Sequence, residues 1–243
     1  MRAPAVRATI ERRLLVNYRV DVEALTAVLP DPFRPAVVDG NGVAGICLIR
    51  LGHVRPAGVP RAFGVTSENA AHRVAVEWDT AGGPVSGVYI PRRDSSSLLT
   101  TMLGGRAFPG WHHRADFRVD EDEESYRVEM TSRDGAVAVT VAARRSDGVM
   151  AGSVFASLDQ ASAFFRGAPL GYAATPTAGC YDGVALTAGQ WAMEPLHLDG
   201  VRSTFFEDPA RFPQGTAVLD SAFLMEHLDS TWTPQLALHG AGV

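Results

Sequence analysis

The stretch HHRADFRVDEDEESYRVEMTSRDGAVAVTVAARR (112–145) alternates apolar and polar side chains in three successive runs. A period of two residues is typical of a β-strand that buries one face. The acidic EDEE (121–124) and the SRDG turn (132–135) separate the runs. Turn residues between alternating segments favour hairpins, so this stretch predicts an antiparallel meander.

In the rest of the chain, further predicted strands alternate with loops. Further strands are predicted for RRLLVNYRV (12–20), VAGICLIRLGHV (43–54), VTSENAAHRVAVEW (65–78) and SGVYIP (86–91). Short helices are predicted for residues 21–30, where Asp21 is the expected N-cap, and for residues 95–105 and 157–167, which end at glycines. The stretch 217–228 is compatible with either strand or helix. We therefore expect one mostly antiparallel β domain spanning residues 1–243, with a few short helices.

Composition excludes several classes of protein. The net charge of -5 and a charged fraction of 20% give no electrostatic basis for binding nucleic acid. No stretch approaches the length of apolar sequence that a membrane span needs, so we expect a cytoplasmic protein without a membrane partner. Cys47 and Cys180 lie far apart, and Cys47 is interpreted as a buried small hydrophobe. No HxH, HExxH or CxxC spacing is present, so no metal is predicted.

The chain contains no lysine, since all 22 of its Lys and Arg residues are arginine. Without lysine, no side-chain amine can form a Schiff base with a carbonyl substrate. Motifs for nucleotide cofactors and for a serine nucleophile are also missing, because no GxGxxG, P-loop or GxSxG is found. No cofactor is predicted.

Two stretches resemble the acetoacetate decarboxylase-like superfamily. LLVNYRVDVEALTAVLPDPFRP (14–35) is similar to its opening strand, short helix and proline stop. VTSENAAHRVAVEW (65–78) is similar to the segment that carries an active-site glutamate, and that glutamate falls on Glu68. Further stretches, among them GVYIPRRDSSS (87–97) and VRSTFFEDPARFP (201–213), resemble an uncharacterised bacterial branch over nearly the whole chain.

The resemblance implies a large, curved antiparallel sheet that forms a cone-like barrel, a ligand cavity inside it, and a homo-oligomer. It also implies one departure. The decarboxylase forms its Schiff base on a lysine, whereas this chain has serines in the corresponding region near Asp94–Leu98. The Schiff-base chemistry is therefore excluded, while the cavity, the glutamate and several arginines are expected to persist.

Three residues are the candidates for catalysis. Glu68 is expected to move protons, because a carboxylate in a partly dry cavity has a raised pKa. Its structural alternative is an ion pair with His72 or Arg73. His72 shares the strand face of Glu68, since their spacing is even, and is either an acid–base partner or a hydrogen-bonded core residue. Arg92 would hold a carboxylate or stabilise an enolate.

Four residues are candidates for ligand binding, namely Arg93, Tyr89, Arg19 and Ser96. Neighbouring residues on a strand face opposite sides, so at most one of Arg92 and Arg93 should face a cavity. The other would form a structural ion pair with Asp94. Tyr89 is either a phenol donor or a packing aromatic, and Arg19 either contacts the ligand or serves as a structural residue at the start of the helix.

The sequence thus favours an enzyme that acts without an imine on a small or medium keto or carboxylate compound, as a decarboxylase, aldol-type cyclase or dehydratase. The expected partner is an anionic or carbonyl small molecule. The alternatives are a non-catalytic protein that binds a small molecule in the same cavity, and a structural role.

Overall fold

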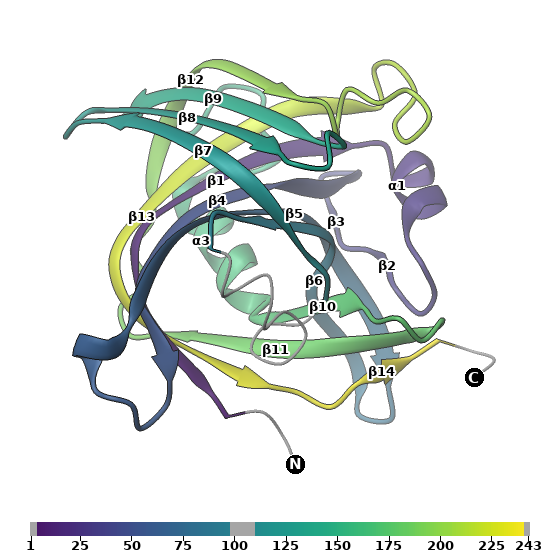
Figure 1. Ribbon diagram of the computed structural model, residues 1–243. Helices are drawn as coiled ribbons and strands as arrows, with labels where there is room; N and C mark the ends of the chain where they lie inside the picture. The colour runs from purple at the N-terminus through teal and green to yellow at the C-terminus, as the bar shows by residue number, and fades with distance from the viewer. Residues whose placement is uncertain (1–3, 98–109, 241–243) are drawn as a thin grey trace.

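The computed structural model describes residues 4–97 and 110–240. Its strands belong to one sheet of 14 strands that closes on itself (Figure 1). In chain order the strands are β1 (Val6–Val20), β2 (Arg34–Pro35), β3 (Val37–Val38), β4 (Asn41–Pro56), β5 (Val65–Thr80), β6 (Gly83–Ser95), β7 (His112–Glu121), β8 (Ser125–Ser132), β9 (Ala138–Arg145), β10 (Leu170–Ala174), β11 (Cys180–Ala188), β12 (Glu194–Ser203), β13 (Ala217–Pro234) and β14 (Leu238–His239).

Closure depends on two long strands that each pair with three others. β13 pairs with β1, with β12 through residues 222–224, and with β11 through residues 230–234. β6 pairs with β5, with β10 through residues 87–89, and with β7 through residues 93–95. A wall of β13, β1, β4, β5 and β6 therefore forms part of two rings, one completed by β10 and β11 and the other by β7, β8, β9 and β12.

Both faces of this wall are buried, which explains the near-continuous apolar runs in its strands. On β1, Leu14 and Val16 belong to a cluster that packs against β8 and β9, whereas Leu15 belongs to a second cluster on the other face. On β4, Ile46 and Cys47 divide in the same way. Alternation along each strand therefore assigns neighbouring residues to different interiors.

The predicted fold class is confirmed: the chain is mostly β, with few and short helices. The meander of residues 112–145 is β7, β8 and β9, paired antiparallel as predicted. The sheet is not wholly antiparallel, because β6 pairs in parallel with both β7 and β10. Each of these pairs is joined by a long connection rather than a hairpin, and the alternation within a strand does not reveal its partner's direction.

The short helices follow their capping signals. α1 (Val22–Val28) begins after Asp21, whose Oδ1 accepts a hydrogen bond from the Ala24 amide at 3.0 Å. α3 (Leu158–Gly167) begins after Ser157, whose side chain accepts from the Gln160 amide, and it lies inside the ring that contains β10 and β11 (Figure 1). A 3-10 turn, η1, covers Arg61–Phe63.

The structure resolves one stretch that was ambiguous in sequence and leaves one predicted helix untested. The ambiguous stretch 217–228 is part of strand β13. The helix predicted for residues 95–105 falls largely outside the described residues, and β6 extends to Ser95.

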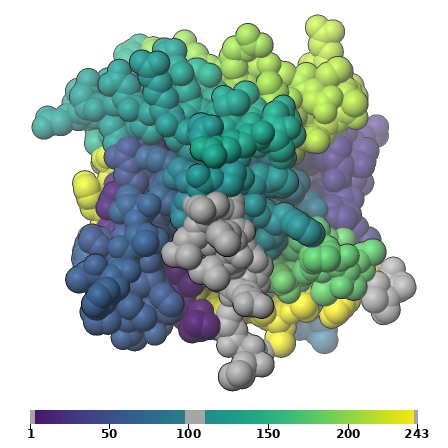
Figure 2. All heavy atoms as spheres, in the orientation of Figure 1, coloured from purple at the N-terminus to yellow at the C-terminus, as the bar shows by residue number. Residues whose placement is uncertain are grey.

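The space-filling view shows one face of the molecule (Figure 2). β7, β8 and β9 lie at its upper left and centre, the segment between β12 and β13 lies at the upper right, and the β4–β5 connection projects at the lower left. Within residues 4–97 and 110–240, no helix is long and apolar enough to cross a membrane.

Candidate functional site

A cavity of about 500 Å³ lies on the face of the wall that carries the second apolar cluster. Its lining comes from β1, β4, β5 and β6 on one side and from α3, β10, β11 and β13 on the other. Most of the lining is apolar, including Ile49, Leu51, Val88, Ile90, Phe164, Phe165, Val184, Leu186, Trp191 and Trp232. A cavity of this size and character suits a small organic ligand.

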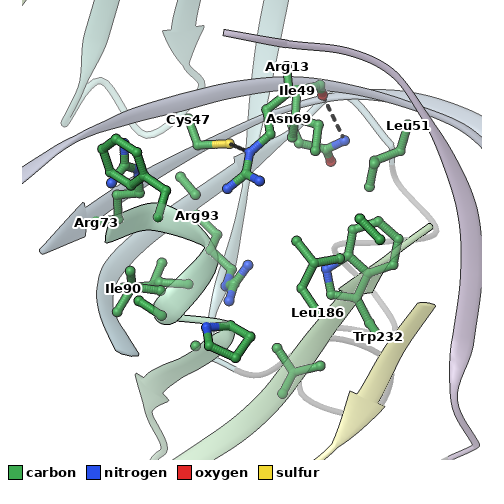
Figure 3. Close-up of a pocket in the computed structure, with 18 of the residues that line it drawn as sticks. Arg13, Cys47, Ile49, Leu51, Asn69, Arg73, Ile90, Arg93, Leu186 and Trp232 are labelled. Carbon is green, nitrogen blue, oxygen red and sulfur yellow. Dashed lines mark hydrogen bonds between the residues drawn. The ribbon is translucent and has the colours of Figure 1, made fainter. Parts of the chain in front are cut away.

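Four arginines interrupt this apolar lining. Three of them come from strands of the wall, and the fourth, the exposed Arg166, comes from α3. Arg13 lies on β1, Arg73 on β5 and Arg93 on β6 (Figure 3). Among the described residues, no carboxylate lies within 4.0 Å of any of the three guanidinium groups. Nε and Nη2 of Arg93 and Nε of Arg73 are buried and have no hydrogen-bond partner within residues 4–97 and 110–240. The cavity therefore has an excess of positive charge.

Burial lowers the pKa of two of these arginines, Arg73 and Arg93. It lowers the pKa of Arg73 to about 10, an effect that Cys47 opposes and the charge of Arg13 reinforces. Burial likewise lowers the pKa of Arg93 to about 10, again opposed by Cys47. Both guanidinium groups remain charged at neutral pH, because a pKa of about 10 lies well above 7. A buried, uncompensated positive charge favours an anion in its vicinity.

Soft and neutral partners hold the arginines in place. Nε of Arg13 donates to Sγ of Cys47 at 3.2 Å. Arg73 donates to Oδ1 of Asn17, and its guanidinium lies 4.8 Å from the ring centroid of Phe165. Neutral partners orient a guanidinium without neutralising it, so the charge stays available to a ligand.

Strand alternation decides which predicted residues reach this cavity. On β5, the odd-numbered Ser67, Asn69 and Arg73 line it, while Glu68 and His72 lie on the opposite face. On β6, Arg93 lines the cavity, and Arg92 points to the other side. The expectation that Arg92 and Arg93 diverge agrees with this geometry, and Arg93 is the one at the cavity.

Arg92 belongs to a dense polar cluster on the far side of the wall. Its guanidinium makes two hydrogen bonds of 2.9 Å to the two carboxylate oxygens of Asp94, whose side chain is 0% exposed. It also donates to Oγ of Ser132 at 2.5 Å and to Asp134 at 2.9 Å. Nearby carboxylates raise the pKa of Arg92 against the opposing effect of burial. Both acceptors of Asp94 are thus taken by Arg92.

Glu68 lies in a closed ring of four charges on the same far side. Its Oε2 accepts from Arg12 at 2.6 Å, and its Oε1 accepts from Arg50 at 2.6 Å. The same two arginines bind Glu121, which completes the ring. Both oxygens of Glu68 are therefore engaged, and the partner is neither His72 nor Arg73, the two structural alternatives that the sequence suggested.

His72 is fully buried and stacks on Phe205, with 4.3 Å between ring centroids. Neither of its ring nitrogens has a hydrogen-bond partner within the described part of the chain. Burial lowers the pKa of His72 to about 3, and the charges of Arg92 and Arg211 act in the same direction. The imidazole is therefore neutral at physiological pH and packs as an aromatic ring.

The remaining predicted ligand-binding residues lie elsewhere. Tyr89 packs in the aromatic cluster around Phe33 and Tyr181. Arg19 donates to the carbonyl oxygen of Gly152 at 3.2 Å, and Oγ of Ser96 accepts from the Glu68 amide at 3.0 Å. Of the predicted site residues, the structure places Arg93 in the lining of the cavity, while the chemical roles of all of them stay predictions.

The neutral state of His72 predicts a specific acid sensitivity. Its pKa in the folded state lies below the ordinary value of 6.5, so the unfolded chain binds the extra proton. Stability is therefore fully present above about pH 6.5 and falls as the pH drops toward 3, at up to about 1.4 kcal/mol per pH unit. In His72→Phe, urea unfolding between pH 6.5 and 4.5 should show a shallower pH dependence. The exposed His239→Gln variant should retain the wild-type slope, and equal slopes for all three proteins would contradict the assignment.

Arg13, Cys47 and His112 also line the cavity, and none of them was predicted from the sequence as a site residue. Arg13 follows Arg12 at a register irregularity of β1, so its face could not be read from alternation. His112 and His113 lie on opposite sides of β7, as their adjacency predicts: His112 lines the cavity, and His113 lies 3.0 Å from Asp134. The sequence signal that could have identified a residue of this cavity is an arginine within an otherwise apolar strand, as at Arg73.

No group of three or more His, Cys, Asp or Glu residues is arranged to hold a metal ion in the described ranges.

Comparison with known proteins relates this cavity to a family and a fold. The family model DUF2071, described as an uncharacterized conserved protein, matches residues 7–206. No curated protein matches the sequence significantly. Acetoacetate decarboxylase from Legionella pneumophila has a similar structure, with a TM-score of 0.60 at 12% identity, over 98% of this chain and 88% of that one.

Two further structures share the fold. An acetoacetate decarboxylase-like enzyme from Sphingomonas wittichii gives a TM-score of 0.62 at 12% identity, over 98% of this chain and 94% of that one. The enduracididine biosynthesis enzyme MppR, solved with pyruvate, gives 0.59 at 12% identity, over 97% and 91%. At these identities the likeness establishes a shared architecture.

Proposed function

Because the chain belongs to the DUF2071 family and has the fold of acetoacetate decarboxylase-like enzymes, we propose that it acts on a keto or carboxylate compound bound in the arginine-lined cavity. The reaction proceeds without an imine, since the sequence has no lysine to form one. The reaction class is decarboxylation, aldol-type cyclisation or dehydration, all of which pass through an enolate-like species.

The observation that carries this proposal is that Arg13, Arg73 and Arg93 line a mainly apolar cavity and have no carboxylate within 4.0 Å among the described residues. Burying a cation without a counter-ion costs free energy, and a bound anion recovers it. Guanidinium groups bind carboxylates through two parallel hydrogen bonds, and they stay charged where water is scarce. The apolar and aromatic lining would accept the rest of the ligand.

The cavity residues can also stabilise charge and move a proton during such a reaction. An arginine that faces the carbonyl oxygen would stabilise the negative charge that develops there when the bond to the carboxylate or to the second carbon breaks. A preorganised donor of this kind contributes roughly 10²–10³-fold to the rate. His112 lines the cavity and is our candidate for moving the proton, a role that the sequence analysis gave to Glu68 and His72.

The structural neighbours support the ligand class. One is an acetoacetate decarboxylase, and MppR was solved with pyruvate and with a condensation product of pyruvate. Acetoacetate and pyruvate, the compounds in these names, are both small keto acids. We propose that the ligand of this chain belongs to the same chemical class, with an apolar part that fills the remainder of the cavity.

A non-catalytic binding protein is the second candidate. The charged groups in the lining are mainly cationic, and the carboxylate of Asp94 binds Arg92. A cavity with binding groups but few proton-transfer groups would suit a carrier. Turnover distinguishes the two functions, since both require anion binding.

The test is a panel of keto acids measured for binding by calorimetry and for turnover by carbon dioxide release and proton NMR. Acetoacetate should bind, and its neutral methyl ester should bind at least about tenfold more weakly, because the ester lacks the charge that the arginines require. Turnover of any member supports the enzyme, and binding alone supports the carrier. Equal affinity for the acid and the ester would contradict both.

A further inference from the structure

Cys47 lies at the centre of the arginine set, in a position that the proposed binding role does not use. It lines the cavity, and its Sγ accepts the hydrogen bond from Nε of Arg13 at 3.2 Å (Figure 3). Arg73 and Arg93 line the same cavity as Cys47. A cysteine thiol can act as a nucleophile, and guanidinium groups beside it can hold an acidic electrophile within its reach.

A second observation points to a ligand at the same place. Arg73 is 4% exposed and lines this cavity, yet its Nε has no hydrogen-bond partner in the part of the chain that the structure describes. Two nitrogens of Arg93 lack partners in the same way, and in Figure 3 its guanidinium points into the space between Ile90 and Leu186. Donors without acceptors around a thiol define a position for an anionic group next to the sulfur.

We propose that Cys47 is a nucleophilic thiol that forms a covalent adduct with an anionic electrophile bound by Arg13, Arg73 and Arg93. The fitting electrophiles are carboxylates with a reactive carbon close to the acid group. Conjugated unsaturated acids and 2-keto acids belong to this class.

The bond changes balance without another reactant. With an unsaturated acid, the thiolate forms a C–S bond at the β-carbon, the π-electron pair moves to the α-carbon, and that carbon takes up the proton that the thiol released. With a 2-keto acid, sulfur adds to the keto carbon, and the oxygen takes the proton to give a hemithioketal. Neither step changes the oxidation state of the pair as a whole.

Two reagents of nearly equal size test the inference. Iodoacetate and iodoacetamide both alkylate thiolates by displacing iodide, but only iodoacetate carries a negative charge. Peptide mass spectrometry of the whole protein, labelled for increasing times, gives a separate rate for each cysteine. Cys180 is the internal control, because it is also a free cysteine, is only partly buried, and does not line the cavity.

The ratio of the iodoacetate rate to the iodoacetamide rate should be at least about tenfold higher at Cys47 than at Cys180, because a cationic cleft concentrates anions. Arg13→Met should lower the ratio at Cys47, and Arg13→Lys should restore part of it by returning a positive charge. Equal ratios at the two cysteines, or labelling of Cys180 alone, would overturn the proposal. Keto-acid binding is measured separately in Cys47→Ser, so failure of this inference is distinguishable from failure of the proposed function.

Discussion

Replacing Glu68 by leucine is expected to lower the free energy of unfolding by about 3–5 kcal/mol, the cost of breaking a buried ion pair from one side. The reason is Arg12, whose side chain is 2% exposed and which would lose one of its two carboxylate partners. Arg50 would lose a partner as well. The ring of Arg12, Glu68, Arg50 and Glu121 has no net charge, and removal of Glu68 leaves one positive charge in excess.

Urea denaturation at pH 7 measures this effect. Asp116→Asn is the matched control, because it removes a carboxylate from an exposed ion pair with Arg133 and should change stability little. The double variant Arg12→Leu/Glu68→Leu should be less destabilised than the sum of its single variants, since the excess charge is removed. A nearly unperturbed Glu68→Leu protein with impaired turnover would instead return Glu68 to the proton-transfer role predicted from the sequence.

The strands were predictable because their signal is local. Alternation over residues 112–145 depends on one buried face, and the capping oxygens of Asp21 and Ser157 act within three residues. The two rings were not predictable from such patterns. They depend on β6 and β13 each changing partners along their length, and a strand's own sequence carries little information about which neighbour it pairs with.

Only part of the site could be predicted from the sequence. The family resemblance led us to expect arginines that hold an anionic ligand, which stays a prediction, and alternation correctly separated Arg92 from Arg93. The faces themselves could not be assigned, because both sides of the wall are buried and thus look alike in sequence. Register irregularities on β1 before Arg13 and on β6 between Tyr89 and Arg92 break the alternation, so that Ile90 and Arg93 both line the cavity although their spacing is odd.

Substitutions of the neighbouring Arg92 and Arg93 are expected to change the free energy of unfolding in opposite directions. Arg92→Ala should lower the free energy of unfolding by about 3–5 kcal/mol, since it leaves the fully buried carboxylate of Asp94 without its partner. Arg93→Met should have the opposite sign and raise stability by about 1–3 kcal/mol without ligand. It replaces a buried cation that lacks a carboxylate by an apolar side chain of similar length.

The same two variants should differ in ligand affinity, with the loss expected in Arg93→Met and not in Arg92→Ala. Arg93→Met removes a charge-assisted contact to the bound acid and should weaken acetoacetate binding at least about tenfold, while folded Arg92→Ala should bind it as the wild type does. Urea unfolding and calorimetry on the same two preparations give both quantities. Such a crossed result would mean that the fold retains a destabilising cation at Arg93 because the ligand needs it. Weakened binding in Arg92→Ala alone would place the site on the opposite face of the wall.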